Sequence, residues 1–95
     1  MLKPLNPLLH SELRLAVMSI LLASESADFV FIRNETGATA GNLSVQLDKL
    51  QRAGYITIEK SFNGKLPRTT CSMTELGRKA MREYVETLQS YINIK

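Results

Sequence analysis

The chain has 95 residues, of which 44% are hydrophobic and 22% charged, a composition typical of one globular domain and not of a disordered chain. Its single cysteine excludes an internal disulfide framework and a zinc site built from several cysteines. The longest apolar stretch, residues 16–23, is far shorter than the roughly 20 residues that span a bilayer, and no signal peptide is evident, so we expect an unprocessed cytoplasmic protein without membrane contact.

The formal net charge of +3 is unevenly distributed along the chain. Residues 1–38 contain three cationic and four anionic side chains, and residues 71–95 contain four and three. Residues 39–70 contain five cationic side chains against two anionic ones, an excess equal to the net charge of the whole chain. Positive charge gathered on one surface makes a site for polyanions, so this middle part is the candidate for one.

The N-terminal part of the chain predicts an irregular start and a first helix. Pro4 and Pro7 lie among leucines, which favours a helix start or an irregular lead-in. Ser11 is a suitable N-cap, and the apolar spacing predicts a buried helix from Leu13 to near Ala23. The polar residues 24–28 predict a turn.

A second helix is predicted directly after this turn. Asp28 is its N-cap and Gly37 ends it, with Phe29, Val30 and Ile32 expected on the buried side. A third helix, about residues 39–53, follows after a brief break and has Thr39 as N-cap. It ends at the pair Ala53-Gly54, and its narrow apolar stripe consists of Leu43, Leu47 and Leu50.

The hydrophobic period then changes from that of a helix to that of strands. Residues 55–61 are rich in β-branched side chains, Asn63-Gly64 is a strong turn signal, and residues 68–73 predict a returning strand. Pro67 is expected at an edge or in the tip because it lacks a backbone donor. Residues 55–73 are therefore predicted to form a hairpin with an extended tip.

A last, long helix is predicted over about residues 74–93, with Thr74 as N-cap and Glu75 in its first turn. The order helix, helix, helix, strand, strand, helix predicts a mainly helical α+β fold, in which a helix-turn-helix is followed by a β-hairpin wing and a long C-terminal helix. We expect residues 1–95 to form this one winged helix-turn-helix domain.

The outer face of the third helix is short and polar near its N-terminus, as a helix that enters the major groove must be. Asn, Gln and Ser side chains can hydrogen-bond to bases, and Val45 can contact a thymine methyl group. A solvated helix face is also polar, but the one-signed charge of Lys60, Lys65 and Arg68 around the hairpin tip favours DNA. The candidate contact residues are Thr39, Gly41, Asn42, Ser44, Val45, Gln46, Lys49, Arg52, Lys65 and Arg68.

Residues 39–55 resemble the recognition helix of winged-helix repressors of the MarR and ArsR kind. The common S-x-x-L-x-x-L-x-x-A-G-hydrophobic run of those families is matched by Ser44, Leu47, Leu50, Ala53, Gly54 and Tyr55. The sequence I-E-K-S-F-N-G-K-L-P-R-T-T-C-S-M-T-E-L-G-R-K-A is similar to their wing and to the start of their final helix. The resemblance covers roughly residues 6–92.

This resemblance implies a homodimer that binds double-stranded DNA in a sequence-specific manner, with recognition helices in successive major grooves and wings on the backbone or in the minor groove. It implies that Asn42, Ser44, Val45 and Gln46 face bases, and that phosphates are held by Lys49, Arg52, Lys65 and Arg68. The chain departs from many relatives at Val45, where they carry Arg or Lys. No particular operator or effector is implied.

The last helix has more apolar residues than one domain requires. We expect the surplus, together with leucines near the N-terminus, to form a dimer surface, although all of it could also cover a single core. The candidate dimer residues are Leu5, Leu8, Leu9, Met81, Tyr84, Val85, Leu88, Tyr91 and Ile92.

Neither an enzyme nor a metal or cofactor site is predicted. One histidine, His10, and one cysteine, Cys71, give at most two soft metal ligands, and no catalytic constellation is recognisable. Cys71 is expected to be a small buried residue. A protein-interaction module with the same fold is the alternative function, in which the four candidate phosphate-binding cations would be dispensable.

Overall fold

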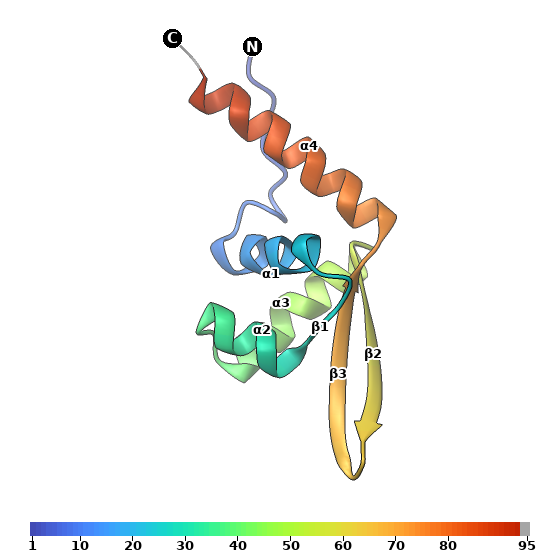
Figure 1. Ribbon diagram of the computed structural model, residues 1–95. Helices are drawn as coiled ribbons and strands as arrows, with labels where there is room; N and C mark the ends of the chain where they lie inside the picture. The colour runs from blue at the N-terminus through green and yellow to red at the C-terminus, as the bar shows by residue number, and fades with distance from the viewer. Residues whose placement is uncertain (94–95) are drawn as a thin grey trace.

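The computed structural model describes residues 1–93 and shows a mainly helical α+β fold of the winged-helix type, as predicted (Figure 1). The elements in chain order are α1 (Glu12–Ala23), β1 (Ala27–Asp28), α2 (Phe29–Thr36), α3 (Ala40–Arg52), β2 (Ile56–Asn63), β3 (Leu66–Met73) and α4 (Glu75–Ile92). Residues 94 and 95, which belong to the predicted domain, lie outside the described residues.

Each helix begins at the side chain predicted to cap it. Ser11, Asp28, Thr39 and Thr74 each accept a hydrogen bond from the backbone N–H three residues further on. Such caps satisfy one of the N–H groups that have no partner inside a helix. The predicted end of α2 is also confirmed, because Gly37 adopts the left-handed conformation with φ 72°. Local sequence signals therefore determine where these helices start.

The core is formed by the apolar stripes of the N-terminal helices. In α1 the side chains of Val17, Met18 and Leu21 are fully buried, and Leu43 and Leu50 of α3 are equally inaccessible. In α2 only Ile32 is fully buried, Phe29 is half-buried, and Val30 is 55% exposed. The expected burial of Val30 is therefore wrong. Residues 30 and 32 are about 200° apart around a helix, so they face opposite sides.

The sheet is antiparallel with strand order β1-β3-β2. The strand β1 was not predicted, since residues 24–28 were interpreted as a turn. Its two residues, Ala27 and Asp28, pair with Cys71 and Thr70 of β3. Two residues are too few to show the alternation by which a strand is identified in a sequence. This pairing attaches the start of α2 to the wing.

The hairpin of β2 and β3 projects beyond the three N-terminal helices as the predicted wing (Figure 1). Its strands pair from Ile56 opposite Met73 to Asn63 opposite Leu66, and Gly64 in the turn has φ 68°. Pro67 lies near the tip opposite Phe62, beyond the part of β3 that pairs with β1. The expected position of this proline is thus confirmed.

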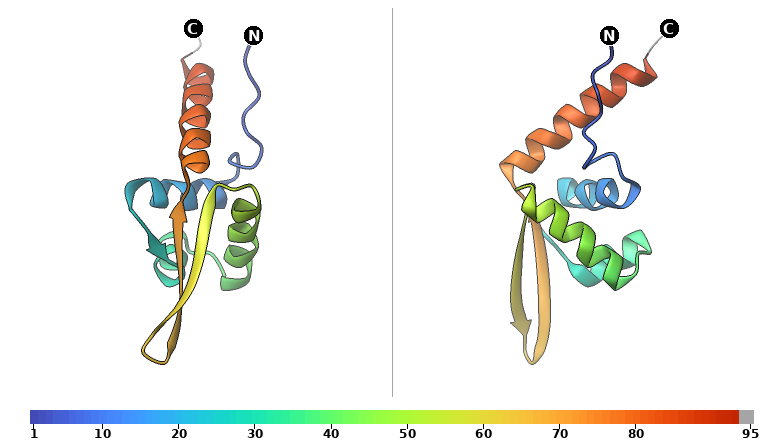
Figure 2. Two further views of the ribbon diagram at one scale, coloured as in Figure 1. Left: turned by 90° about the vertical axis from the view of Figure 1, so that its right-hand side faces the viewer. Right: turned by 180° about the vertical axis from the view of Figure 1, so that it is seen from behind.

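The helix α4 begins next to the C-terminal end of α3 and leads away from the body. Thr74 donates a hydrogen bond to the carbonyl of Gly54 (2.6 Å), and its backbone N–H donates to the carbonyl of Tyr55 (3.0 Å). The N-terminal segment runs beside α4, where the hydroxyl of Tyr91 donates to the carbonyl of Lys3 (2.6 Å; Figure 2). Within residues 1–93, no helix has both the length and the apolarity needed to cross a membrane.

Candidate nucleic-acid interface

The outer face of α3 is open to solvent while its other face packs in the core. Leu43, Leu47 and Leu50 fix the orientation of the helix, because all three are buried. The predicted contact residues Thr39, Gly41, Asn42, Ser44, Val45, Lys49 and Arg52 are exposed. Their side chains are small near the N-terminus and cationic near the C-terminus. A helix with this face fits a groove about 12 Å wide and brings polar groups to base edges.

Gln46 differs from its neighbours because it is half-buried and already hydrogen-bonded. Its amide oxygen Oε1 accepts from Nη1 of Arg14 in α1, and its Nε2 donates to Oδ1 of Asn42 (3.1 Å). The structure thus places Gln46 on the flank of α3 and not at its outermost edge. Arg14 was missed in the sequence, although a cation inside an apolar helix was an available signal.

The cationic end of α3 carries one ion pair. Nε of Arg52 lies 2.9 Å from Oδ2 of Asp48, one helical turn earlier, and both side chains are largely exposed. An exposed pair of this kind contributes about 0–1 kcal/mol and opens easily. Lys49 takes part in none of the ion pairs found within residues 1–93. Its charge is therefore the one most freely available to a phosphate.

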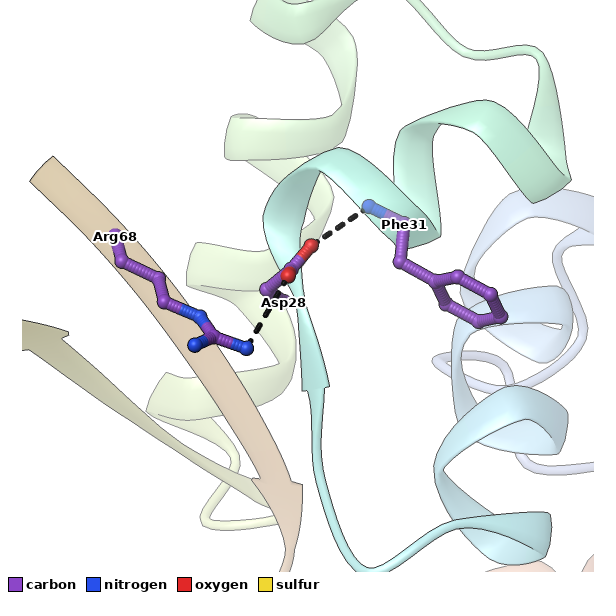
Figure 3. A network of polar contacts seen from close by, with 3 residues as sticks. All are labelled: Asp28, Phe31 and Arg68. Carbon is purple, nitrogen blue, oxygen red and sulfur yellow. Dashed lines mark hydrogen bonds and ion pairs between the residues drawn. The ribbon is translucent and has the colours of Figure 1, made fainter. Parts of the chain in front are cut away.

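In the wing, Arg68 is engaged with the start of α2. Its Nη2 lies 3.5 Å from Oδ2 of Asp28, whose Oδ1 accepts from the backbone N–H of Phe31 (2.8 Å; Figure 3). Asp28 therefore caps α2 and holds the predicted phosphate ligand at the same time. Lys65, in the turn at the tip, is exposed. The two predicted wing cations thus differ in how freely they can move.

A groove of about 610 Å³ separates α3 from the wing. Ser44, Asp48 and Gln51 line it from the helix, and Ile58, Lys60 and Thr69 line it from the strands, with Phe29 at one end. Side chains alternate across a strand, so Lys60 lies on the same face as the buried Ile56. The sequence indicated that Lys60 belongs to the wing but not that it faces the recognition helix.

The predicted dimer residues fall into two groups. Leu9, Met81 and Tyr84 are buried in the core of the protomer, so their assignment to a surface between two copies is corrected. The correction follows from where α4 leaves the body. Met81 lies beside the core, whereas Val85, one turn later on the same face, is exposed. The remaining candidates are half-buried or exposed: Leu5, Leu8, Val85, Leu88, Tyr91 and Ile92.

The single cysteine and histidine have structural surroundings. Cys71 is fully buried on β3, and loss of solvation raises the pKa of its thiol to about 11. A thiol with such a pKa is protonated and unreactive at neutral pH. Nδ1 of His10 lies 3.0 Å from the hydroxyl of Tyr84, which joins the N-terminal segment to α4. Within residues 1–93, no three His, Cys, Asp or Glu side chains are grouped as metal ligands.

Comparison with known proteins agrees with this geometry. The winged helix DNA-binding domain family matches the chain over residues 13–92. An uncharacterized protein of Methanocaldococcus jannaschii is 30% identical over 87 residues, which cover 90% of this chain and 95% of that protein. The structure of a transcriptional regulator homologue from Pyrococcus horikoshii OT3 has a TM-score of 0.84 and 28% identity, covering 90% of this chain and 85% of that one.

A regulator of the MarR family from Silicibacter pomeroyi shares the fold. It superposes with a TM-score of 0.69 at 20% identity, covering 87% of this chain and 55% of that one. The predicted resemblance to MarR-type winged helices is thus confirmed. The fold and family are those of transcriptional regulators, which are not enzymes. The chain belongs to the family of winged helix DNA-binding domains.

Proposed function

We propose that the protein regulates transcription as a homodimer that binds double-stranded DNA in a sequence-specific manner. The observation that carries this proposal is the pairing of an exposed, polar N-terminal half of α3 with a projecting wing that contains Lys60, Lys65 and Arg68. The helix supplies groups that distinguish base pairs in the major groove, and the wing supplies charge for the backbone or the minor groove.

Affinity in this proposal comes chiefly from phosphate neutralisation. Contacts to about four to six phosphates per subunit give a slope of log K against log salt near −0.9 times that number. Lys49 and Lys65 are the cleanest candidates to test, since both are exposed and neither joins an ion pair among the described residues. Removing Arg52 or Arg68 would also leave Asp48 or Asp28 without its partner.

The test is binding of a random-sequence duplex to the double variant Lys49→Gln/Lys65→Gln at several salt concentrations. We expect the magnitude of the salt slope to fall by about 2 relative to wild type, one unit for each lost phosphate contact. The charge-matched control is Lys79→Gln/Arg82→Gln, at two exposed positions on α4. Affinity that is independent of salt in the wild-type protein would contradict the proposal.

A protein-interaction module remains the second candidate because the wing also exposes apolar side chains. Phe62 is 75% exposed and Leu66 is 70% exposed. Neutralising Lys49, Arg52, Lys65 and Arg68 together distinguishes the two functions. The DNA proposal expects duplex binding to be abolished, whereas the alternative expects partner binding to persist.

The homodimer is supported by the part of α4 that leaves the body. The molecule measures 56 × 25 × 21 Å, and its long dimension follows α4 and the N-terminal segment away from the wing (Figure 1). Val85 and Ile92 are exposed there, with Leu5, Leu88 and Tyr91 half-buried beside them. A second copy packed on these residues would bury apolar surface that a lone protomer leaves in water.

The cytoplasmic location follows in this proposal from the DNA partner and stays a prediction. A small-molecule effector, if one acts, has no chemistry that the described residues specify.

A further inference from the structure

We propose that Arg14 is a positioning residue that determines which polar end of the Asn42 side chain faces DNA. This inference rests on the proposed function, because it concerns how α3 reads a base. Arg14 lies on α1, and Gln46 and Asn42 lie one turn apart on α3. Nη1 of Arg14 donates to Oε1 of Gln46, and Nε2 of Gln46 donates to Oδ1 of Asn42 (3.1 Å).

The direction of this relay is determined by its first member. A guanidinium has five N–H donors and no acceptor, so only the oxygen of the Gln46 amide can face it. The Gln46 NH₂ group must then point the other way, and its partner on Asn42 must be the acceptor Oδ1. The Asn42 amide nitrogen, Nδ2, is left as the free end. Reversing Asn42 alone would place two NH₂ groups against each other.

The relay is held most firmly at its inner end. Arg14 is half-buried, and its Nε also donates to the carbonyl of Leu8 (2.5 Å), so the guanidinium is held at two points. Hydrogen bonds from a charged donor are roughly twice as strong as neutral ones. Gln46 is half-buried and Asn42 is exposed. The orientation set inside the protein is therefore transmitted outward to a side chain at the surface.

The consequence is a base preference. A fixed Nδ2 group donates, so Asn42 fits a base edge that offers acceptors. In the major groove guanine offers N7 and O6, whereas cytosine offers the donor N4. An asparagine free to rotate could satisfy either edge. We expect the base at the Asn42 position to be guanine over cytosine by about tenfold, the lower part of the range for a good base contact.

The experiment is selection of random duplexes by the purified full-length chain, followed by sequencing of the bound pool. The variant Asn42→Ala identifies the motif position that depends on Asn42. In Arg14→Met the guanine-to-cytosine ratio at that position is expected to fall to about twofold, with the other positions unchanged. The control Lys79→Met removes the same charge from an exposed site on α4 and is expected to keep the wild-type ratio.

Gln46→Glu tests the polarity itself. The carboxylate keeps the hydrogen bond from Arg14 but has no donor for Asn42. The Asn42 amide is then expected to turn its Nδ2 toward position 46 and present its oxygen outward. The preference at that motif position should reverse from guanine to cytosine. A purely structural role of Arg14 would not produce such a reversal.

The outcomes separate this inference from the proposed function. A wild-type motif whose guanine-to-cytosine ratio is the same in Arg14→Met and Gln46→Glu overturns the relay and leaves sequence-specific binding intact. No motif with the wild-type protein overturns both. If thermal melting shows that Arg14→Met does not fold, Gln46→Glu decides alone: reversal supports the relay, and an unchanged ratio overturns it.

Discussion

At the scale of single residues, Gly77 is where α4 comes closest to another backbone segment. A Cβ atom at this position would lie 2.1 Å from the carbonyl oxygen of Tyr55 and 3.1 Å from Cγ of Met73. The carbonyl of Tyr55 cannot move freely, because it accepts the hydrogen bond from the N–H of Thr74. Glycine is thus required here by space and not by an unusual φ angle.

We predict that Gly77→Ala lowers the free energy of unfolding by about 3 kcal/mol, the upper range for overpacking a site that cannot relax. Urea denaturation measures the change. Gly41→Ala is the matched control, because a Cβ there meets nothing within 4 Å and alanine favours a helix by about 0.5–1 kcal/mol. Equal stability of the two variants would show that α4 is not held against Tyr55 as described.

Cys71 gives a second prediction at this scale. Its pKa is raised from 9.0 to about 11 by burial, so the folded state keeps the proton that the unfolded state loses first. The stability from this group is therefore complete below pH 9 and is lost as the pH rises toward 11. We expect the unfolding free energy to fall by roughly 2–3 kcal/mol more in wild type than in Cys71→Ala over this interval. Parallel pH profiles would contradict the burial of the thiol.

At the scale of elements, the helices and the wing follow from local patterns, whereas several contacts between them do not. The four caps, the leucine stripe of α3 and the turn at Gly64 depend on neighbours within a few residues, so the sequence predicts them. The strand β1 and the relay through Arg14 were missed. Asp28 and Thr70, like Arg14 and Gln46, meet only after the chain has folded. No period in the sequence records such pairs.

The same limit explains the dimer residues. The apolar stripe of α4 is continuous in the sequence, and its division into a core part and an exposed part depends on where the body ends. Met81 and Val85 are equivalent by periodicity but differ in burial. The outer face of α3 was predicted correctly because Leu43 and Leu50 alone define the inner face.

Thr74 tests how α4 is joined to the rest of the fold. Its Oγ1 accepts from the N–H of Gly77 (3.0 Å) and donates to the carbonyl of Gly54 (2.6 Å). We predict that Thr74→Ala lowers the unfolding free energy by about 1–2 kcal/mol, the usual cost of a lost N-cap. Thr74→Ser retains the hydroxyl and should cost much less. Thermal or urea unfolding compares the two, and equal losses would mean that the methyl group and not the hydroxyl matters.

At the scale of the whole molecule, the two ends have separate roles in the proposed function. The wing and α3 lie at one end, and α4 extends from the other with the N-terminal segment beside it (Figure 2). Two copies joined through their α4 helices would present two recognition helices to one duplex, as a two-fold symmetric site requires.

We predict that Val85→Glu/Ile92→Glu converts a dimer into a monomer without unfolding it. Both side chains are exposed in the protomer, so the change introduces charge only where a second copy would pack. Sedimentation equilibrium measures the mass, and circular dichroism checks the helix content. The control is Val30→Glu, an exposed apolar position on α2, which should leave the dimer intact. A wild-type monomer at micromolar concentration would contradict the proposed assembly.

Sequence-specific binding by a symmetric dimer is tested most directly by the selection of random duplexes on the wild-type protein. The account predicts an enriched palindrome whose half-sites are about 34 Å apart, one helical turn of DNA, because each α3 enters a successive major groove. Asn42→Ala should weaken one position in each half-site. A bound pool with no enriched motif would contradict the account and leave nonspecific DNA binding or a protein partner as the function.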